Sequence, residues 1–245
     1  IDRFNFNYSY LSYSLGINQK LDSKTAMFAR FSSGNKGPEL NYYFNNFANV
    51  PIANKGEVQK IHQAELGIKV IAEQYSATGT LFWSQLDNIG IANFEFDDST
   101  NTVFYTPIPM NTSSTFGFEW ETAYTAINNI SVKFNGMLQN PIAKKWSVYD
   151  ASGTVETTDD ITINYSGNQL AFNPKMMSNL SLVYEKDNFN LYYNWHHMGK
   201  RFGNVANAFE LDAYSVFNFG GGCKITKRIT ASFEVSNLFN SAGLA

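Results

Sequence analysis

The sequence is poor in cysteine, in charged residues and in long apolar runs, and each shortage excludes a class of protein. The single cysteine, Cys223, excludes an internal disulfide framework and a zinc site built from cysteines. No apolar run approaches the roughly 18 residues that a membrane-spanning helix needs. Lysine and arginine form no basic stripe and the net charge is -3, so we expect no nucleic-acid partner.

Motifs for catalysis and cofactor binding are scarce as well. The Gly-x-Ser-x-Gly motif of a nucleophile elbow does not occur. Gly220-Gly221-Gly222 lies before Lys224, but a phosphate-binding loop needs a lysine directly after a glycine at the start of a helix. The acidic pairs Asp97-Asp98 and Asp159-Asp160 favour solvated loop charge over cation binding. We therefore expect no cofactor, no metal site and no enzymatic activity.

Aromatic residues are abundant instead. They make up 16% of the chain, whereas charged residues, also at 16%, fall well below the usual quarter. The mean hydropathy is nonetheless negative, at -0.27, because serine, threonine, asparagine and glycine supply the balance. A chain that is rich in aromatics without being continuously hydrophobic is either a β-rich soluble protein or a transmembrane β-barrel.

Period-two alternation predicts about ten strands, each with one apolar and one polar face. They are 11–19, 25–33, 62–70, 75–85, 115–124, 130–138, 177–184, 189–197, 214–224 and 229–235. In the strand 115–124, Phe116, Phe118 and Trp120 alternate with Glu119 and Glu121. A lysine or arginine on the lipid face near the bilayer midplane costs roughly 2–4 kcal/mol. Charges opposite the aromatics therefore favour a membrane barrel, although a soluble sandwich alternates as well.

The connections between these strands alternate strictly between short and long. Tight polar turns are expected at 20–24, 72–74, 125–129, 185–188 and 226–228, and long connections at 34–60, 86–114, 139–175 and 199–212. A membrane barrel produces this asymmetry, because its short turns face the periplasm and its long loops face outside. A soluble meander or propeller has no reason to place every long loop at one end. The predicted fold class is therefore all-β, an antiparallel transmembrane β-barrel.

Several segments then resemble the C-terminal half of the barrel of TonB-dependent outer-membrane receptors. Residues 29–40 (ARFSSGNKGPEL) are similar to a family segment in which a strand leads into a loop with glycine and proline. Residues 57–69 (EVQKIHQAELGIK) resemble the strand that follows, and 211–216 (LDAYSV) and 235–240 (VSNLFN) resemble the last hairpins. The positions that carry the resemblance are Arg30, Gly34, Pro38, Glu65, Gly67, Asn237 and Phe239.

The resemblance implies about ten consecutive meander strands of a 22-stranded barrel. It implies that residues 1–245 are a partial barrel domain, with the plug domain, the first half of the barrel and the last strand absent. It also implies a place in the outer membrane of a Gram-negative-type bacterium, in contact with outer-membrane lipid and lipopolysaccharide. The implied protein partners are the receptor's own plug domain and TonB with its inner-membrane energising complex, reached through the missing N-terminal region.

The long connections are where ligand recognition is expected, because binding residues concentrate on loops held by a rigid scaffold. The candidates combine aromatics with histidine and arginine: Tyr42, Tyr43, Phe44, Phe94, Tyr105, His196, His197 and Arg201. Packing of these side chains into a closed surface cap is an equally good interpretation. The adjacent histidines are expected on opposite faces of a strand, so they do not readily share one metal.

The function implied by the resemblance is active import of a scarce ligand, a siderophore, a carbohydrate or a peptide, with TonB-coupled energy. A passive porin, or another outer-membrane barrel without energy coupling, is the alternative. An outer-membrane enzyme and a soluble sandwich or propeller are the remaining hypotheses.

Overall fold

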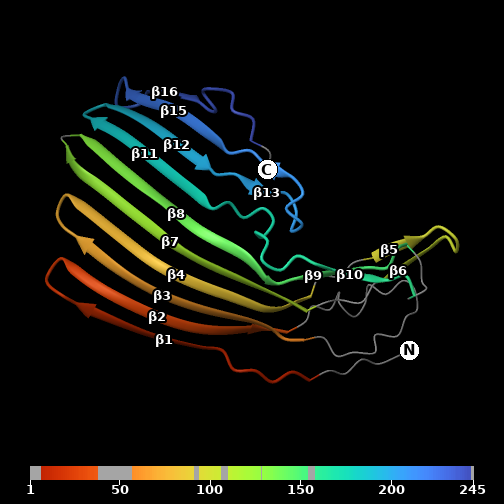
Figure 1. Ribbon diagram of the computed structural model, residues 1–245. Helices are drawn as coiled ribbons and strands as arrows, with labels where there is room; N and C mark the ends of the chain where they lie inside the picture. Colours follow the sequence, from red (N-terminus) through yellow and green to blue (C-terminus); the bar gives the residue numbers. More distant parts are fainter. Residues whose placement is uncertain are drawn as a thin grey trace.

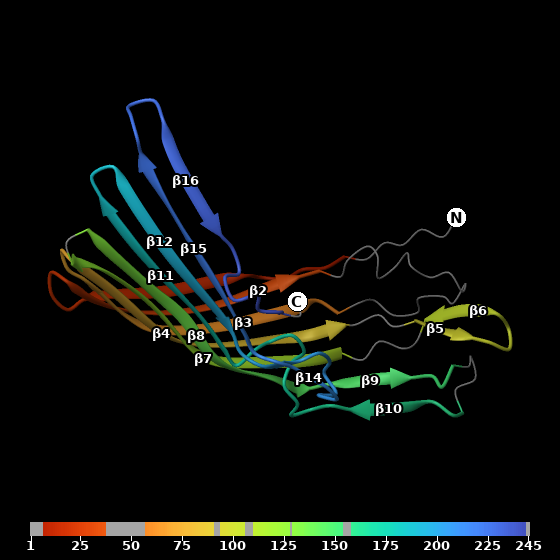
Figure 2. The same cartoon turned by 90° about the horizontal axis from the view of Figure 1, so that it is seen from above.

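The computed structural model describes residues 7–37, 57–90, 94–105, 110–127, 129–153 and 158–243, and all regular structure within these ranges is β-strand. Ten long strands form one sheet, in which each is hydrogen-bonded antiparallel to the long strands before and after it in the sequence. The sheet bends into an open, trough-like wall (Figures 1 and 2). No helix in the described part of the chain is long and apolar enough to cross a membrane.

The long strands of this sheet agree with all ten predicted segments. They are β1 (Tyr13–Lys20), β2 (Thr25–Lys36), β3 (Gln59–Ile71), β4 (Tyr75–Gly90), β7 (Met110–Ile127), β8 (Ile130–Lys145), β11 (Met176–Lys186), β12 (Phe189–Met198), β15 (Tyr214–Lys224) and β16 (Thr230–Val235). Among the described residues, β1 and β16 each pair on one side only. The all-β antiparallel meander is thus confirmed, and the closed 22-stranded ring stays a prediction.

The sheet has one polar and one apolar face, as the alternation predicts. On the polar face, the Asn179 amide donates to Asn135 Oδ1 at 2.9 Å across β11 and β8. On the apolar face of β7 and β8, the rings of Trp120 and Phe134 lie 5.7 Å apart. Because side chains alternate along every strand, these contacts assign each neighbouring side chain to one face or the other.

No described segment covers the apolar face as a second layer. Leu66 is 50% exposed and Phe116 57%. The buried hydrophobic residues among those described are Ala143, Trp146 and Ala151, which lie at and beyond the loop end of β8. A soluble sandwich buries the inner faces of two packed sheets, and soluble monomers rarely expose so broad an apolar surface. A broad uncovered apolar face of this kind is typical of the wall of a membrane β-barrel.

The five tight turns lie together at one end of the sheet and the long connections at the other (Figure 1). Local hydrogen bonds shape these turns. Asp22 Oδ1 accepts from the backbone N–H groups of Lys24 and Thr25 at 2.7 and 2.8 Å. Asn129 and Asp187 take left-handed φ angles of 66° and 49°, which asparagine and aspartate tolerate best among non-glycine residues. The predicted asymmetry of the connections is confirmed.

The long connections contain structure that the sequence pattern did not predict. Three small hairpins lie within them: β5 (Phe94–Asp97) with β6 (Thr102–Tyr105), β9 (Ser147–Asp150) with β10 (Ile161–Asn164), and β13 (Arg201–Phe202) with β14 (Glu210–Leu211). The prediction that β8 ends at Leu138 was wrong, since the strand continues to Lys145. β11 accompanies β8 only to Leu138, so Pro141 lies where β8 has lost that neighbour, a position that proline tolerates.

Candidate ligand-binding wall

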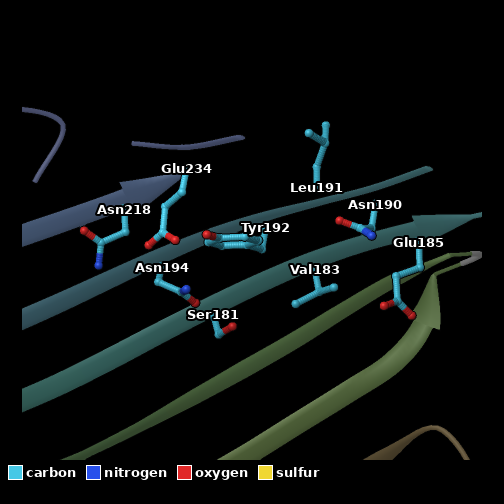
Figure 3. A pocket seen from close by; sticks show the side chains of 9 residues that line it. All are labelled: Ser181, Val183, Glu185, Asn190, Leu191, Tyr192, Asn194, Asn218 and Glu234. Carbon is cyan, nitrogen blue, oxygen red and sulfur yellow. The ribbon is translucent and has the colours of Figure 1, made fainter. Parts of the chain in front are cut away.

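A hollow of about 550 Å³ lies on the polar face between β11 and β16 (Figure 3). Its polar lining comes from four strands and includes Ser181, Asn190, Tyr192, Asn194, Asn218 and Glu234. Amides, hydroxyls and a carboxylate therefore converge on one surface. Such a lining supplies hydrogen-bond donors and acceptors, which fix the orientation of a polar ligand.

The hollow depends on glycine in β15. Tyr192 lies flat across Gly220, its direct register partner, and its hydroxyl points toward Glu234 (Figure 3). A Cβ at position 220 would lie 2.4 Å from the Tyr192 hydroxyl oxygen and 2.5 Å from Cζ. Only glycine leaves room for the ring, so Gly220 permits the close approach of a tyrosine from the neighbouring strand.

A row of polar side chains crosses the wall nearer the long connections. Asn179 donates to Asn135 Oδ1 at 2.9 Å, and the oxygen of the Asn179 amide lies 2.5 Å from His196 Nδ1. Because an amide oxygen accepts, His196 donates through Nδ1. A neutral imidazole with its proton on Nδ1 presents the lone pair of Nε2 outward, where it can accept a hydrogen bond or bind a metal.

Tyr214, which the sequence did not single out, brings His196 and Arg201 together. Its ring centroid lies 6.5 Å from that of His196, and the Arg201 guanidinium carbon lies 5.6 Å from the same centroid. The Tyr214 hydroxyl also contacts Met198 Sδ at 3.7 Å. Arg201 is only 4% exposed, so its guanidinium group does not reach into solvent. It lies over the face of the Tyr214 ring as a cation–π contact. Two predicted candidates therefore share one cluster.

The adjacent histidines lie on opposite faces, as predicted. His197 Nδ1 lies 3.0 Å from Ser215 Oγ, and its ring stacks 5.8 Å from Trp195 on the apolar face. This position separates His197 from the His196 cluster. Phe94 and Tyr105 are register partners in the β5–β6 hairpin, which lies within the long connection between β4 and β7. Tyr42, Tyr43, Phe44 and Pro38 lie outside the described residues.

The described long connections are tied to one another by side chains. Asn111, 1% exposed, donates to the Ser147 carbonyl at 3.2 Å and accepts from the Ser147 N–H at 2.8 Å. Glu95 accepts from the N–H groups of Ala151 and Gly153 at 3.0 and 2.9 Å. In the parts of the chain that are described, the loops thus form a hydrogen-bonded layer.

The acidic pairs are engaged within this layer. A hydrogen bond from the Ser99 hydroxyl holds the pKa of Asp97 below its ordinary value. Asp160 accepts from the Tyr149 hydroxyl, which raises the pKa of that tyrosine. Within the described ranges, no group of three or more histidine, cysteine, aspartate or glutamate residues is placed to hold a metal ion.

The positions that carry the family resemblance have physical roles in the sheet. Arg30 Nε donates to Ser14 Oγ at 3.2 Å and lies directly opposite Glu65 in the register of β2 and β3. Gly67 lies under the Phe28 ring, where a Cβ would come within 2.2 Å of Cζ. Arg30 thus links β2 with β1, and the Phe28 ring over Gly67 helps to fix the pairing of β2 with β3.

Other resemblance positions act at strand ends. Gly34 leaves room for Ile61, whose Cγ2 would lie 3.0 Å from an added Cβ. Asn237 takes a φ of 51°, and its amide both accepts from the Ser241 N–H and donates to the Ser241 carbonyl, at 2.9 and 3.0 Å. The Phe239 ring packs edge-on against Phe217 at 5.0 Å. Asn237 and Phe239 thus close the turn after β16.

A single-layered antiparallel meander with a bare apolar face and a hollowed polar face is the wall of a transmembrane β-barrel. The model of the TonB dependent receptor-like β-barrel family matches residues 2–238, and the chain belongs to this family. Curated proteins yield no match to the sequence.

Solved structures support the same fold. The siderophore receptor PiuA from Acinetobacter baumannii has a TM-score of 0.70 at 17% identity, covering 93% of this chain and 31% of its own. The ferric yersiniabactin uptake receptor FyuA from Yersinia pestis has a TM-score of 0.68 at 17% identity, with 92% and 32% covered. The copper transporter OprC has a TM-score of 0.67 at 15% identity, with 94% and 33% covered. The chain thus spans about a third of the length of these proteins.

Proposed function

We propose that the chain forms the C-terminal half of the barrel wall of an outer-membrane receptor, which imports a scarce ligand with energy delivered through TonB. The observation that carries the proposal is the two-faced, single-layered sheet of a chain that belongs to this receptor family. The apolar face meets outer-membrane lipid and lipopolysaccharide, and the polar face lines the interior, where the plug domain packs. Further strands must pair with β1 and β16, because lipid offers no hydrogen-bond partners to the backbone N–H and C=O groups of an open sheet edge.

Energy coupling distinguishes this proposal from a passive porin. Uptake of a labelled ligand is measured in cells that express the full-length receptor, with TonB present and with TonB deleted. An energised receptor accumulates ligand above its external concentration, and loses accumulation when TonB is removed or the proton gradient is collapsed. Uptake that only equilibrates, and that continues unchanged without TonB, would establish the porin instead.

We further propose that the ligand first contacts the loop end of the polar face, at His196 and Tyr214, with Arg201 positioning the tyrosine. Siderophores come first among the ligands to test because the names of PiuA and FyuA point to iron uptake, and carbohydrates and peptides follow. The remaining candidates, Tyr42, Tyr43, Phe44, Phe94 and Tyr105, stay predicted contacts on the long connections.

The adjacent histidines provide a matched pair of variants for this contact. His196→Ala is expected to raise the dissociation constant of the purified full-length receptor at least about tenfold, a loss typical of a central binding residue. His197→Ala removes the same side chain from the apolar face and is expected to change it less than about twofold. Equal effects of the two substitutions would contradict the assignment.

A further inference from the structure

Three of the chain's six methionines lie side by side on the polar face. The register places Met177 of β11 directly opposite both Met137 of β8 and Met198 of β12. Their face is set by neighbours in the same alternation, since Asn135, Asn179 and His196 belong to the hydrogen-bonded row two residues away. Side chains directly opposite each other on antiparallel strands have Cβ atoms about 4.5–5.5 Å apart. The three thioethers therefore form a continuous row.

The row lies on a mostly polar face, which also carries a few apolar side chains such as Val183 and Val216. The wall around it carries amides, hydroxyls and carboxylates, and all three methionine side chains are half-buried rather than sealed in a core. Methionine has three rotatable bonds and a polarisable sulfur, so neighbouring thioethers can turn toward a common point. Thioethers are ligands that select soft metal ions, of which Cu(I) is the biological example.

His196 completes the set of soft ligands. It lies on the same strand and face as Met198, two residues away, and diagonally opposite Met177. Its Nδ1 proton is held by Asn179, which leaves Nε2 as a lone-pair donor. A metal-binding histidine is usually oriented in this way by an oxygen acceptor at its other nitrogen. Glu119, opposite Met137 in the register of β7 and β8, supplies a negative charge at the end of the row.

We propose that Met137, Met177, Met198 and His196 form a binding site for Cu(I) on the interior wall, with Met177 at its centre. Tyr214 holds the Met198 sulfur at 3.7 Å and so positions one of the ligands. The inference rests on the thioether row and not on the likeness to OprC, because 15% identity shows the fold alone. It goes beyond energised import, since binding at equilibrium needs neither TonB nor movement of a plug.

The test uses the full-length receptor in detergent, carrying Cys223→Ser so that the exposed thiol binds no copper. Anaerobic competition with a chromogenic Cu(I) chelator gives the dissociation constant. Met177→Leu keeps the apolar volume while removing the sulfur, and is expected to weaken Cu(I) binding at least about tenfold. Replacing all three methionines by leucine is expected to abolish binding and remove the sulfur signal from the copper X-ray absorption spectrum.

Met176→Leu is the matched control, because the neighbouring methionine points to the apolar face. It is expected to leave Cu(I) affinity within about twofold of the parent, and Asn179→Ala to weaken it about tenfold through loss of the histidine orientation. Binding of Zn(II) as tight as that of Cu(I), or equal losses from Met176→Leu and Met177→Leu, would overturn the proposal. So would full affinity in the triple variant. TonB-dependent uptake, measured separately in that variant, distinguishes failure of the copper site from failure of the receptor function.

Discussion

Leu81 offers the most direct test of which face meets lipid. It lies in β4 six residues from Tyr75 at the turn end and six from Asp87 at the loop end, and all three follow the same alternation. With about 3.3 Å per residue and a strand tilt of about 45°, Leu81 lies about 14 Å from either residue along the membrane normal. The two distances add to about 28 Å, close to the roughly 25 Å height of an apolar barrel band.

The polar ends of this span support that placement. Gln85 donates to the Asp87 carboxylate at 2.9 and 3.0 Å and accepts from Lys144 at 2.8 Å. The charged groups of Asp87 and Lys144 therefore lie at the loop end of the apolar band. At the other end, Tyr75 lies opposite Tyr124, as expected of an interfacial aromatic belt. Leu81, 44% exposed, is therefore expected at the midplane.

Leu81→Arg is expected to destabilise the folded receptor by roughly 2–4 kcal/mol, which lowers the folded-to-unfolded ratio roughly 30- to 900-fold. Thr80→Arg places the same side chain one residue away on the polar face, opposite Glu119 and Gly67, and is expected to cost less than about 1 kcal/mol. The measurement is urea unfolding of the full-length receptor in phospholipid vesicles. A penalty at position 80 equal to or larger than that at 81 would refute the assignment of the faces.

Three further predictions concern packing, turn geometry and pH. Gly117→Ala is expected to destabilise the receptor by about 1–3 kcal/mol in urea unfolding, because its Cβ would lie 2.6 Å from the Leu138 carbonyl oxygen. Asn237→Ala is expected to cost about 1–3 kcal/mol in the same assay, since it keeps the strained φ of 51° and loses the amide bonds, whereas Asn237→Gly should cost less. The Lys24 backbone N–H holds the pKa of Asp22 below its ordinary 3.8, so its stabilisation is complete above that pH and lost as the pH falls through the lowered pKa.

Each of these predictions has an outcome that contradicts it. A Gly117→Ala variant as stable as the parent would mean that β7 and β8 separate at no cost. An Asn237→Gly variant less stable than Asn237→Ala would show that backbone strain is unimportant in the turn after β16. For Asp22, unfolding is followed in acid with Asp22→Asn as the control; an equally steep pH dependence in that variant would exclude the carboxylate as its source.

The strands were predictable because each carries its own signal. Within β7, Phe116, Phe118 and Trp120 alternate with Glu119 and Glu121, and no distant contact is needed to read that pattern. The hairpin β9–β10 gives only a weak signal, because each of its strands has four residues. Its position depends on Asn111 and Glu95, which reach it from 36 and 56 residues away. Strands this short, held by distant side chains, are not predicted reliably from local alternation.

The candidate site was predictable only in part, for a related reason. His196 and His197 are equivalent by residue type, and only the alternation separates them between the two faces. Tyr214 could not be predicted as a site residue, because its role depends on its position opposite Met198, 16 residues earlier in the sequence. Arg201 was selected as a charged loop residue, yet its guanidinium is buried against Tyr214. These contacts depend on the register between neighbouring strands, which the sequence of one strand alone does not specify.

Contacts on the polar face help to fix the register. Phe28 lies over Gly67 and Tyr192 over Gly220, each pair directly opposite across two strands. A slip of one residue would place Phe28 opposite Leu66 or Ile68 and would turn every polar-face residue of the strand to the apolar face. For β12, that slip would turn both His196 and Met198 to the apolar face and so take them out of the methionine row. The contacts that fix the register therefore also keep the proposed copper ligands on one face.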